Sequence, residues 1–526
     1  MAEAEKSSDS SQRASADQGA VESLAPVRVP FLAYILGAIA AIGGFVFGYE
    51  SGQISGFLAM SDFMERFGEN GAFSALRSGT IVGLLSAGTL IGCLISAPLA
   101  DKLGRRYTIS ASAFFYIVGV LIEITSSTDW VQFAMGRFAA GLGIGALSTS
   151  VPMYQSESIP KTIRGAVVSS YQLAITLGIW TAYMVNYGTS AQYSNSAQWR
   201  IPNGLSALWA ILLGSSILLM PESPRFAFRM GREEEARRNM ARLNGVEEFD
   251  PLINQEIREI QEGIAAERKG GDHPWSLTLL AGQQLTGANF FFYYGTTIFA
   301  ATGLENSYVT SIILGTVNVV STIIGIWIMQ HCGRRKSLMA GAACMCMCFL
   351  VFSFVGHFQL DHARPQNTPQ AGNLMITFTC FFIFAFATTW GPMVWAVVAE
   401  MYPARYRAKC MALATASNWL FNFLISFFST FITNKIDYLY GLVFAGCCFA
   451  LFFVVFFFMM ETKDRSLEEI DIMYVLRINP INSANWDSMA AGPEGGVNTD
   501  NAYPATGDHT FSQSGQTGEV LRVQNE

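Results

Sequence analysis

The chain has 526 residues, of which 51% are hydrophobic and only 14% are charged. Together with 40 phenylalanines and a mean hydropathy of +0.32, this composition excludes an ordinary soluble domain and indicates a membrane protein with many spans. The net charge of −7 says little about function, because tails and loops carry most of the charged residues.

The first 30 residues are polar, so we expect a disordered tail without a cleavable signal peptide. Twelve apolar segments follow, and each is about long enough to cross a bilayer as a helix. These segments cover residues 31–52, 78–100, 107–127, 130–152, 166–188, 203–220, 276–302, 308–330, 337–356, 373–399, 409–433 and 440–459. A charged stretch with a helical pattern separates the sixth segment from the seventh.

This order predicts an all-α polytopic membrane protein with twelve transmembrane helices in two six-helix bundles. The bundles comprise residues 31–220 and 276–460, and a helical insert, residues 221–275, links them. Basic residues concentrate in the loops after even-numbered helices, which places those loops, the insert and both termini in the cytoplasm. We expect the polar tail, residues 461–526, to be mostly disordered.

Two charged loop patterns occur twice, six helices apart. Gly104-Arg-Arg matches Gly333-Arg-Arg, and the stretch from Glu157 to Arg164 is similar to residues 400–407. Repeats with a binding site between them are typical of secondary transporters, and charges at matching ends predict a reversible cytoplasmic gate. The alternative is solvated surface pairs, each worth about 0–1 kcal/mol. The gate candidates are Asp101, Arg105, Arg106, Glu157, Arg164, Arg334, Arg335, Glu400 and Arg407.

Polar side chains interrupt the seventh segment, where Gln283, Gln284, Thr286 and Asn289 lie in a run without charged residues. A polar face at membrane depth must meet other helices or a water-filled cavity. Amides donate and accept hydrogen bonds without net charge, which suits a hydroxyl-rich ligand such as a sugar. The alternative is that these amides only hold helices together, and the spacing does not decide between the two.

Helices 10 and 11 add a bend and two indoles. Gly391-Pro allows the tenth helix to bend. Trp395 and Trp419 offer flat apolar faces to the C–H face of a sugar ring, and Asn418 offers hydrogen bonds. The alternative for each Trp is ordinary packing or an interfacial belt.

Among the ionisable residues inside predicted spans, one acid and one base stand out. Glu50 stands near the outer end of the first helix, where a carboxylate is costly unless it is neutral, paired or hydrated. Arg137 is a plausible partner within the fourth helix. The pair is our candidate for proton coupling, and the alternatives are an acid at a helix end and an arginine that reaches the interface.

The chain shows no pattern typical of an enzyme or a metalloprotein. Its nine cysteines have neither disulfide nor metal-ligand spacing. We find no nucleophile with a base, no phosphate loop and no metal cluster, and therefore expect no catalysis, no cofactor beyond a co-transported proton and no nucleic-acid partner.

Taken together, the motifs over residues 31–470 resemble the sugar-porter family of the major facilitator superfamily, and most closely its filamentous-fungal hexose (glucose-type) transporters. They are Phe47-Gly-Tyr-Glu-Ser-Gly, Asp101-Lys-Leu-Gly-Arg-Arg, Pro152-Met-Tyr-Gln-Ser-Glu, Arg164-Gly, Pro221-Glu-Ser-Pro-Arg, Gln283-Gln-Leu-Thr-Gly and Glu461-Thr-Lys. The resemblance implies the major facilitator fold and hexose uptake across the plasma membrane by alternating access, as a monomer. It also implies sugar contacts from Gln172, Gln283, Gln284, Asn289, Asn318, Trp395, Asn418 and Trp419.

Four departures from the family pattern stand out. Glu50 replaces the usual Asp, Gln330 stands where the second loop repeat should carry an acid, and Met460 replaces a Pro. The fourth is a short stretch before Gln283, where only residues 276–282 follow Trp275. This predicts a seventh helix shortened at its cytoplasmic start.

Two functions fit these residues. The first is a hexose transporter, acting by facilitated diffusion or with a proton. The second is a glucose sensor on the same fold that signals through its cytoplasmic tail. The tail is of moderate length without repeats, which favours transport. The sequence alone does not distinguish which hexose is bound, or how tightly.

Overall fold

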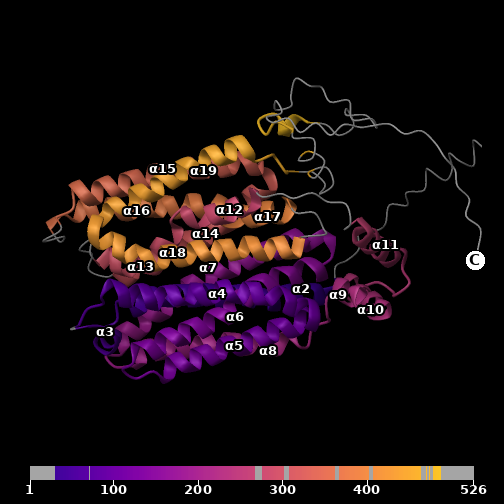
Figure 1. Cartoon of the computed structure of the whole chain (residues 1–526), viewed down its shortest axis with the longest axis horizontal. Helices are drawn as coiled ribbons and strands as arrows, with labels where there is room; N and C mark the ends of the chain where they lie inside the picture. The colour runs from indigo at the N-terminus through magenta and orange to yellow at the C-terminus, as the bar shows by residue number, and fades with distance from the viewer. Residues whose placement is uncertain are drawn as a thin grey trace, which may run out of the picture.

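The computed structural model describes residues 30–69, 71–266, 275–300, 307–361, 367–401, 407–463 and 478–486, together with Ile470 and Met473. Helices fill this part of the chain, which contains no β-strand. In Figure 1 the long helices run side by side, with the first half of the chain below and the second half above. The predicted N-terminal tail and most of the predicted C-terminal tail lie outside the described residues.

Six long helices form the first half, as predicted. They are α2 (Phe31–Phe57), α4 (Ala75–Leu103), α5 (Arg105–Thr125), α6 (Trp130–Ser158), α7 (Lys161–Gln192) and α8 (Ala197–Ile217), with the short α3 (Ser61–Phe67) between the first two. Most of them extend beyond the predicted apolar segments, because polar residues at their ends continue the helix. Within this half, α2 packs along α7 and α4 packs along α6.

The second half has six helical positions, two of which are divided. The elements are α12 (Trp275–Leu285), α13 (Ala288–Ala300), α14 (Ser307–His331), α15 (Arg334–Phe358), α16 (Pro369–Ala385), η2 (Phe386–Trp390), α17 (Gly391–Met401), α18 (Arg407–Ile436), η3 (Asp437–Leu439) and α19 (Tyr440–Phe458). The twelve predicted helical positions are therefore all occupied in the described part of the chain.

Local sequence explains both divisions. The seventh position breaks between α12 and α13 at Gly287, whose φ of +86° is in the region that favours glycine. The tenth position passes through a π-helical turn, η2, immediately before Gly391 and Pro392. Such turns and prolines are typical of bent helices, so the π-helical turn coincides with the position of the predicted bend. Despite its short start, the seventh position still spans residues 275–300.

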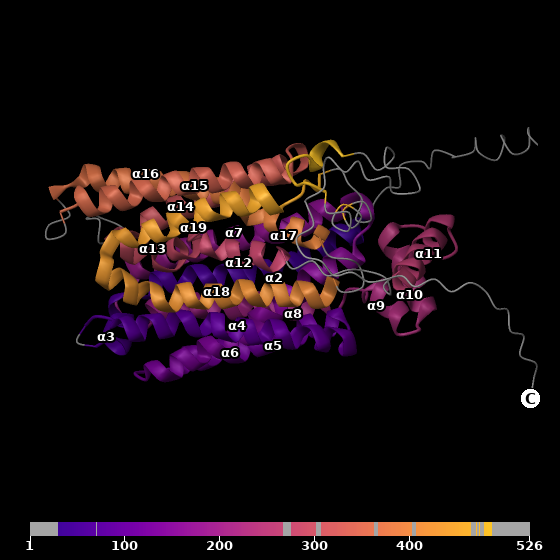
Figure 2. The same cartoon turned by 45° about the horizontal axis from the view of Figure 1, so that its top comes forward.

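The predicted insert is helical and lies at one end of the bundle, which we call the insert end (Figures 1 and 2). It comprises α9 (Pro224–Arg229), α10 (Glu233–Asn244) and α11 (Pro251–Ala266). Met240 of α10 and Ile257 of α11 belong to a small apolar core of the insert, separate from the cores of the bundle. The short α3 lies at the opposite end, which we call the far end.

The surface of the bundle is apolar and its interior is partly polar. Among the described residues, seven stretches are long and apolar enough to cross a membrane, including α2, α4, α5, α14 and α15. Large side chains such as Phe114 (62% exposed) and Phe449 (60% exposed) face outward. Glu50 and Arg137 are fully buried instead. This distribution is the one that a lipid environment favours.

The two halves contact each other through α18 with α4 and through α14 with α7. The Ser86 hydroxyl donates to Asn422 (2.7 Å), and the Trp180 indole donates to Thr316 (3.0 Å). At the far end, Ser55 of α2 bonds Thr296 of α13 (2.6 Å). These contacts between the halves lie at mid-depth or toward the far end.

Candidate functional site

A cluster of amides joins α12 to α18 near the middle of the bundle. Asn418 donates to Gln283 Oε1 (3.0 Å) and to the carbonyl of Leu280 (2.9 Å), and it accepts from Gln284 Nε2 (3.0 Å). Gln283 donates in turn to the carbonyls of Trp390 (2.8 Å) and Gly391 (3.0 Å). The predicted polar face of the seventh helix is therefore linked to both the eleventh helix and the bend of the tenth.

The cluster continues past the break at Gly287. Asn289, in the first turn of α13, donates to the side-chain oxygen of Gln284. Asn422 donates to the same oxygen (3.3 Å) and accepts from the Tyr293 hydroxyl (3.1 Å). The break thus lets side chains from both pieces of the seventh position meet α18. The resulting row of amides and hydroxyls is mostly uncharged and lies beside the contact between the two halves.

Sequence reasoning missed Asn422 as a member of this cluster. It lies four residues after Asn418, so both side chains project from one face of α18. That spacing was the available signal. Ser86 was not identifiable in this way, since it reaches Asn422 from the other half of the chain.

Four predicted sugar contacts lie outside the amide cluster. Trp419 packs its ring against Phe47 with centroids 5.1 Å apart and donates to Ser148 across the halves (3.4 Å). Trp395 packs at the edge of the apolar core. Asn318 is 2% exposed, and its side chain makes no hydrogen bond to another described residue. Gln172 extends its amide toward Gly391, beside the bend that Gln283 also touches.

The predicted pair of Glu50 and Arg137 forms a buried ion pair. Both side chains are fully buried, which excludes the alternatives of a hydrated helix end and of an arginine at the interface. Glu50 also accepts from the Tyr116 hydroxyl (2.6 Å) and from Gln53 (2.7 Å). A carboxylate with three donors is well compensated for its burial. A proton-coupling role for the pair stays a prediction.

At the insert end, Arg105 pairs with Glu157, another residue of the predicted gate. Its guanidinium is nearly fully buried; Nη2 donates to Glu157 Oε1 (3.0 Å), and Nε lies 2.9 Å from Oε2 in the same ion pair. It lies 3.7 Å from Asp101, which is half exposed. Arg106 donates instead to the carbonyls of Leu218 and Met220. All these bonds stay within the first half.

Two carboxylates that the gate prediction omitted occupy equivalent positions in the two halves. Glu222 accepts from the backbone N–H groups of Arg105 (3.0 Å) and Arg106 (3.3 Å) at the start of α5. Glu461 accepts from those of Arg334 (2.7 Å) and Arg335 (3.2 Å) at the start of α15. A carboxylate there satisfies helix N–H groups and favours the helix dipole. In the sequence, both carboxylates were visible as an acid that directly follows predicted helices 6 and 12.

We expect Glu222→Ala to lower the stability of the first half by about 1–3 kcal/mol, because the buried N–H groups of Arg105, Arg106 and Ser223 would lose their acceptor. The measurement is the melting temperature of the purified protein in detergent. Glu247→Ala, on an exposed position of the insert, is the matched control. Equal melting temperatures for the two variants would contradict the capping role.

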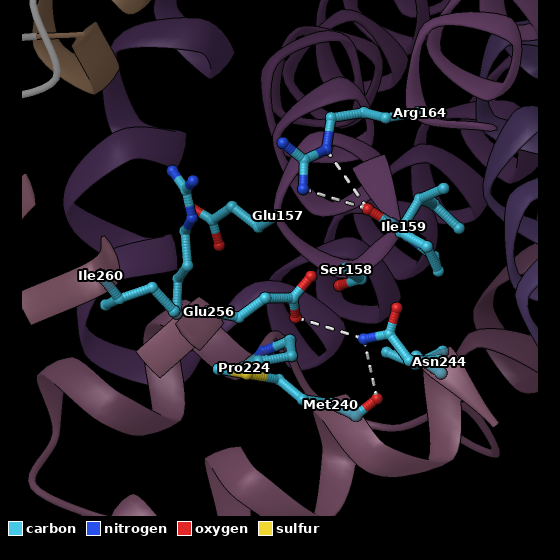
Figure 3. A pocket seen from close by; sticks show the side chains of 12 residues that line it. Glu157, Ser158, Ile159, Arg164, Pro224, Met240, Asn244, Glu256 and Ile260 are labelled. Atoms are coloured by element: carbon cyan, nitrogen blue, oxygen red, sulfur yellow. Dashed lines mark hydrogen bonds between the residues drawn. The ribbon is translucent and has the colours of Figure 1, made fainter. Parts of the chain in front are cut away.

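Two residues of the predicted gate, Glu157 and Arg164, line a pocket between the insert and the first half (Figure 3). Arg164 donates there to the carbonyl of Ile159 (3.2 Å), and Asn244 donates to Glu256 (3.2 Å). Glu400 and Arg407 were also predicted, but their side chains lie outside the described part of the structure. An ion-pair gate between the halves therefore stays a prediction.

Comparison with known proteins places this chain in a family. Its residues 36–474 match the family model described as sugar (and other) transporter. Hexose transporter 2 of Kluyveromyces lactis is 44% identical over 499 residues, covering 89% of this chain and 88% of that protein. The galactose transporter of Saccharomyces cerevisiae is also 44% identical, over 469 residues that cover 85% of this chain and 82% of that protein. The low-affinity glucose transporter HXT4 of the same yeast is also 44% identical over 469 residues, which cover 85% of this chain and 81% of that protein.

Solved structures agree on the fold. The xylose transporter XylE of E. coli, in a partially occluded inward open conformation, has a TM-score of 0.70 at 24% identity, covering 83% of this chain and 100% of that chain. The proton:xylose symporter XylE bound to 6-bromo-6-deoxy-D-glucose also gives 0.70 at 24% identity, with coverage of 84% and 99%. At this identity the likeness shows the major facilitator fold alone. With the family match over most of its length, the chain belongs to the sugar transporter family of the major facilitator superfamily.

Proposed function

We propose that the protein carries a hexose, with glucose the first candidate, across the plasma membrane by alternating access, with both termini in the cytoplasm. The observation that carries the proposal is the amide cluster around Asn418, at mid-depth beside the contact between the halves. Each amide there exchanges a bond to its neighbour for one to a sugar hydroxyl at little net cost. The yeast relatives named as hexose, glucose and galactose transporters support the same substrate class.

The test is uptake of labelled glucose by the full chain in a yeast without hexose carriers of its own. We expect saturable uptake that unlabelled glucose competes away. Absence of uptake from protein that reaches the plasma membrane would overturn transport and favour a sensor. Labelled fructose, galactose and xylose, used as competitors in turn, define which hydroxyl positions the site requires.

The same cells reveal how transport is driven. We expect an uncoupler to reduce accumulation of glucose at acid external pH, because Glu50 and Arg137 form a fully buried pair that protonation would disrupt. Uptake that is indifferent to the uncoupler would identify facilitated diffusion and reduce the pair to a structural role. A Glu50→Asp variant, which keeps the acid, is the control for any effect of Glu50→Gln.

A further inference from the structure

A second carboxylate lies beside the buried pair and has no role in the mechanism so far. Glu123, near the end of α5, is fully buried. It accepts from Asn203 Nδ2 (2.9 Å), and Asn203 accepts from Gln53 (3.4 Å), which also donates to Glu50 (2.7 Å). One chain of hydrogen bonds therefore connects the two carboxyl groups across α5, α8 and α2.

The residues around Glu123 carry too little positive charge to balance Glu123 and Glu50 if both were ionised. The helices packed around it contribute Glu50 from α2, Arg137 from α6 and Tyr116 from α5 itself. The next cation, Arg200 of α8, donates to the carbonyl of Ser126 (2.9 Å). Nearby, α4 contributes only the carbonyl of Ile81, which accepts from Arg137 (3.4 Å). Among the described residues of this cluster, Arg137 is therefore the one guanidinium that can pair with either Glu50 or Glu123.

The hydrogen bonds distinguish the two acids. Glu50 accepts from Arg137, Tyr116 and Gln53, so three donors compensate a negative charge on its carboxyl group. Glu123 accepts only from Asn203, and its Oε1 is buried without a partner among the described residues. An ionised carboxylate in that setting would be an uncompensated buried charge, which costs far more than a neutral acid.

Arg137 also acts on Glu123 through its charge. Its Nη2 is buried without a hydrogen-bond partner among the described residues, like Oε1 of Glu123. The backbone of α6 lies against the acid, since a Cβ on Gly136 would lie 2.6 Å from Glu123 Cγ. Both carboxyl groups are therefore neighbours of the same guanidinium, and Arg137 and Glu123 each have one polar atom available for a changed arrangement.

We infer that Glu50 and Glu123 share a single proton, which sits on Glu123 while Glu50 pairs with Arg137. The cluster is then neutral, with one cation, one anion and one neutral acid. Removal of the Glu50 charge would leave Arg137 with Glu123 as its only acid, and Glu123 would release its proton to water and become the counter-ion. Glu123 is thus a proton-binding site on α5, and the inference rests on the proposed function for its role in transport.

Infrared spectroscopy of the purified, reconstituted full chain tests this arrangement directly. We expect a carbonyl stretch from a protonated, buried carboxylic acid at neutral pH, absent in Glu123→Gln. The same band should vanish in Glu50→Gln and persist in Glu50→Asp, which keeps the counter-ion of Arg137. No band in the unchanged protein, a band that survives Glu123→Gln, or one that survives Glu50→Gln would each overturn the shared proton.

The design separates this inference from the proposed function. The infrared band requires no sugar, so a chain that fails to take up glucose would still give an answer about the proton. In a chain that does transport, Glu123→Gln should flatten the dependence of uptake on external pH between acid and neutral. An unchanged pH profile would overturn the transport role of Glu123. Glu50→Asp allows the comparison even if one glutamine variant folds poorly, because its band must match that of the unchanged protein.

Discussion

Asn418→Ala is expected to remove most glucose uptake while the protein still reaches the membrane. The side chain makes three hydrogen bonds that link α18 to α12, to Leu280, Gln283 and Gln284. When sugar is bound, its loss would leave a sugar hydroxyl without a partner at about 1–3 kcal/mol, which corresponds to roughly 5- to 140-fold in sugar affinity. Gln283→Ala should have the same effect, because it removes the link to the bend of the tenth helix.

The control for this prediction lies on the same helix. Asn434 is exposed near the end of α18, so Asn434→Ala should leave uptake unchanged. Uptake is measured per molecule at the cell surface, together with the folded fraction after detergent extraction. If Asn418→Ala loses folded protein in proportion to uptake, the amides hold helices together and the sugar site must lie elsewhere.

The sequence was sufficient to predict where the helices lie. It was less informative about which faces of the helices contact one another. Long apolar runs identify spans in any packing, so the twelve helical positions agree with the structure. The partnership of Glu50 with Arg137 was also predictable, because a buried charge needs a counter-ion and few candidates exist within the spans. Glu123 was overlooked, although an acid near the end of the third helix was visible.

Contacts between distant helices were the least predictable. The bond from Ser86 to Asn422 joins residues 336 positions apart and depends on the rotation of two helices about their axes. The break at Gly287 was equally hidden, since the chain contains 48 glycines and only the fold decides which adopt a positive φ. The roles of Glu222 and Glu461 were also hidden, since each accepts from the backbone at a helix start of its own half.

Gly48→Ala is expected to prevent the first half from folding. Gly44, Gly48 and Gly52 recur every fourth residue of α2 along its contact with α7. A Cβ at position 48 would overlap the backbone carbonyl of Ile175, and one at position 52 would lie 2.9 Å from that of Ile179. Small residues allow such close approach of helices in a membrane. A backbone carbonyl cannot move aside as a side chain does, so we expect a cost above the usual 1–3 kcal/mol of overpacking.

Gly188→Ala is the matched control for this prediction, since a Cβ at this exposed position of α7 meets no atom within 4 Å. The measurement is the monodisperse fraction of detergent-extracted protein by size-exclusion chromatography, with total expression as the reference. Because Gly48 lies two residues before Glu50, a loss of uptake alone would not separate packing from proton coupling. A Gly48→Ala protein that is monodisperse but inactive would show that α2 and α7 can separate, and that their close contact positions Glu50 for transport. A protein that is absent from the monodisperse fraction would show that the contact between these two helices is required for the fold itself.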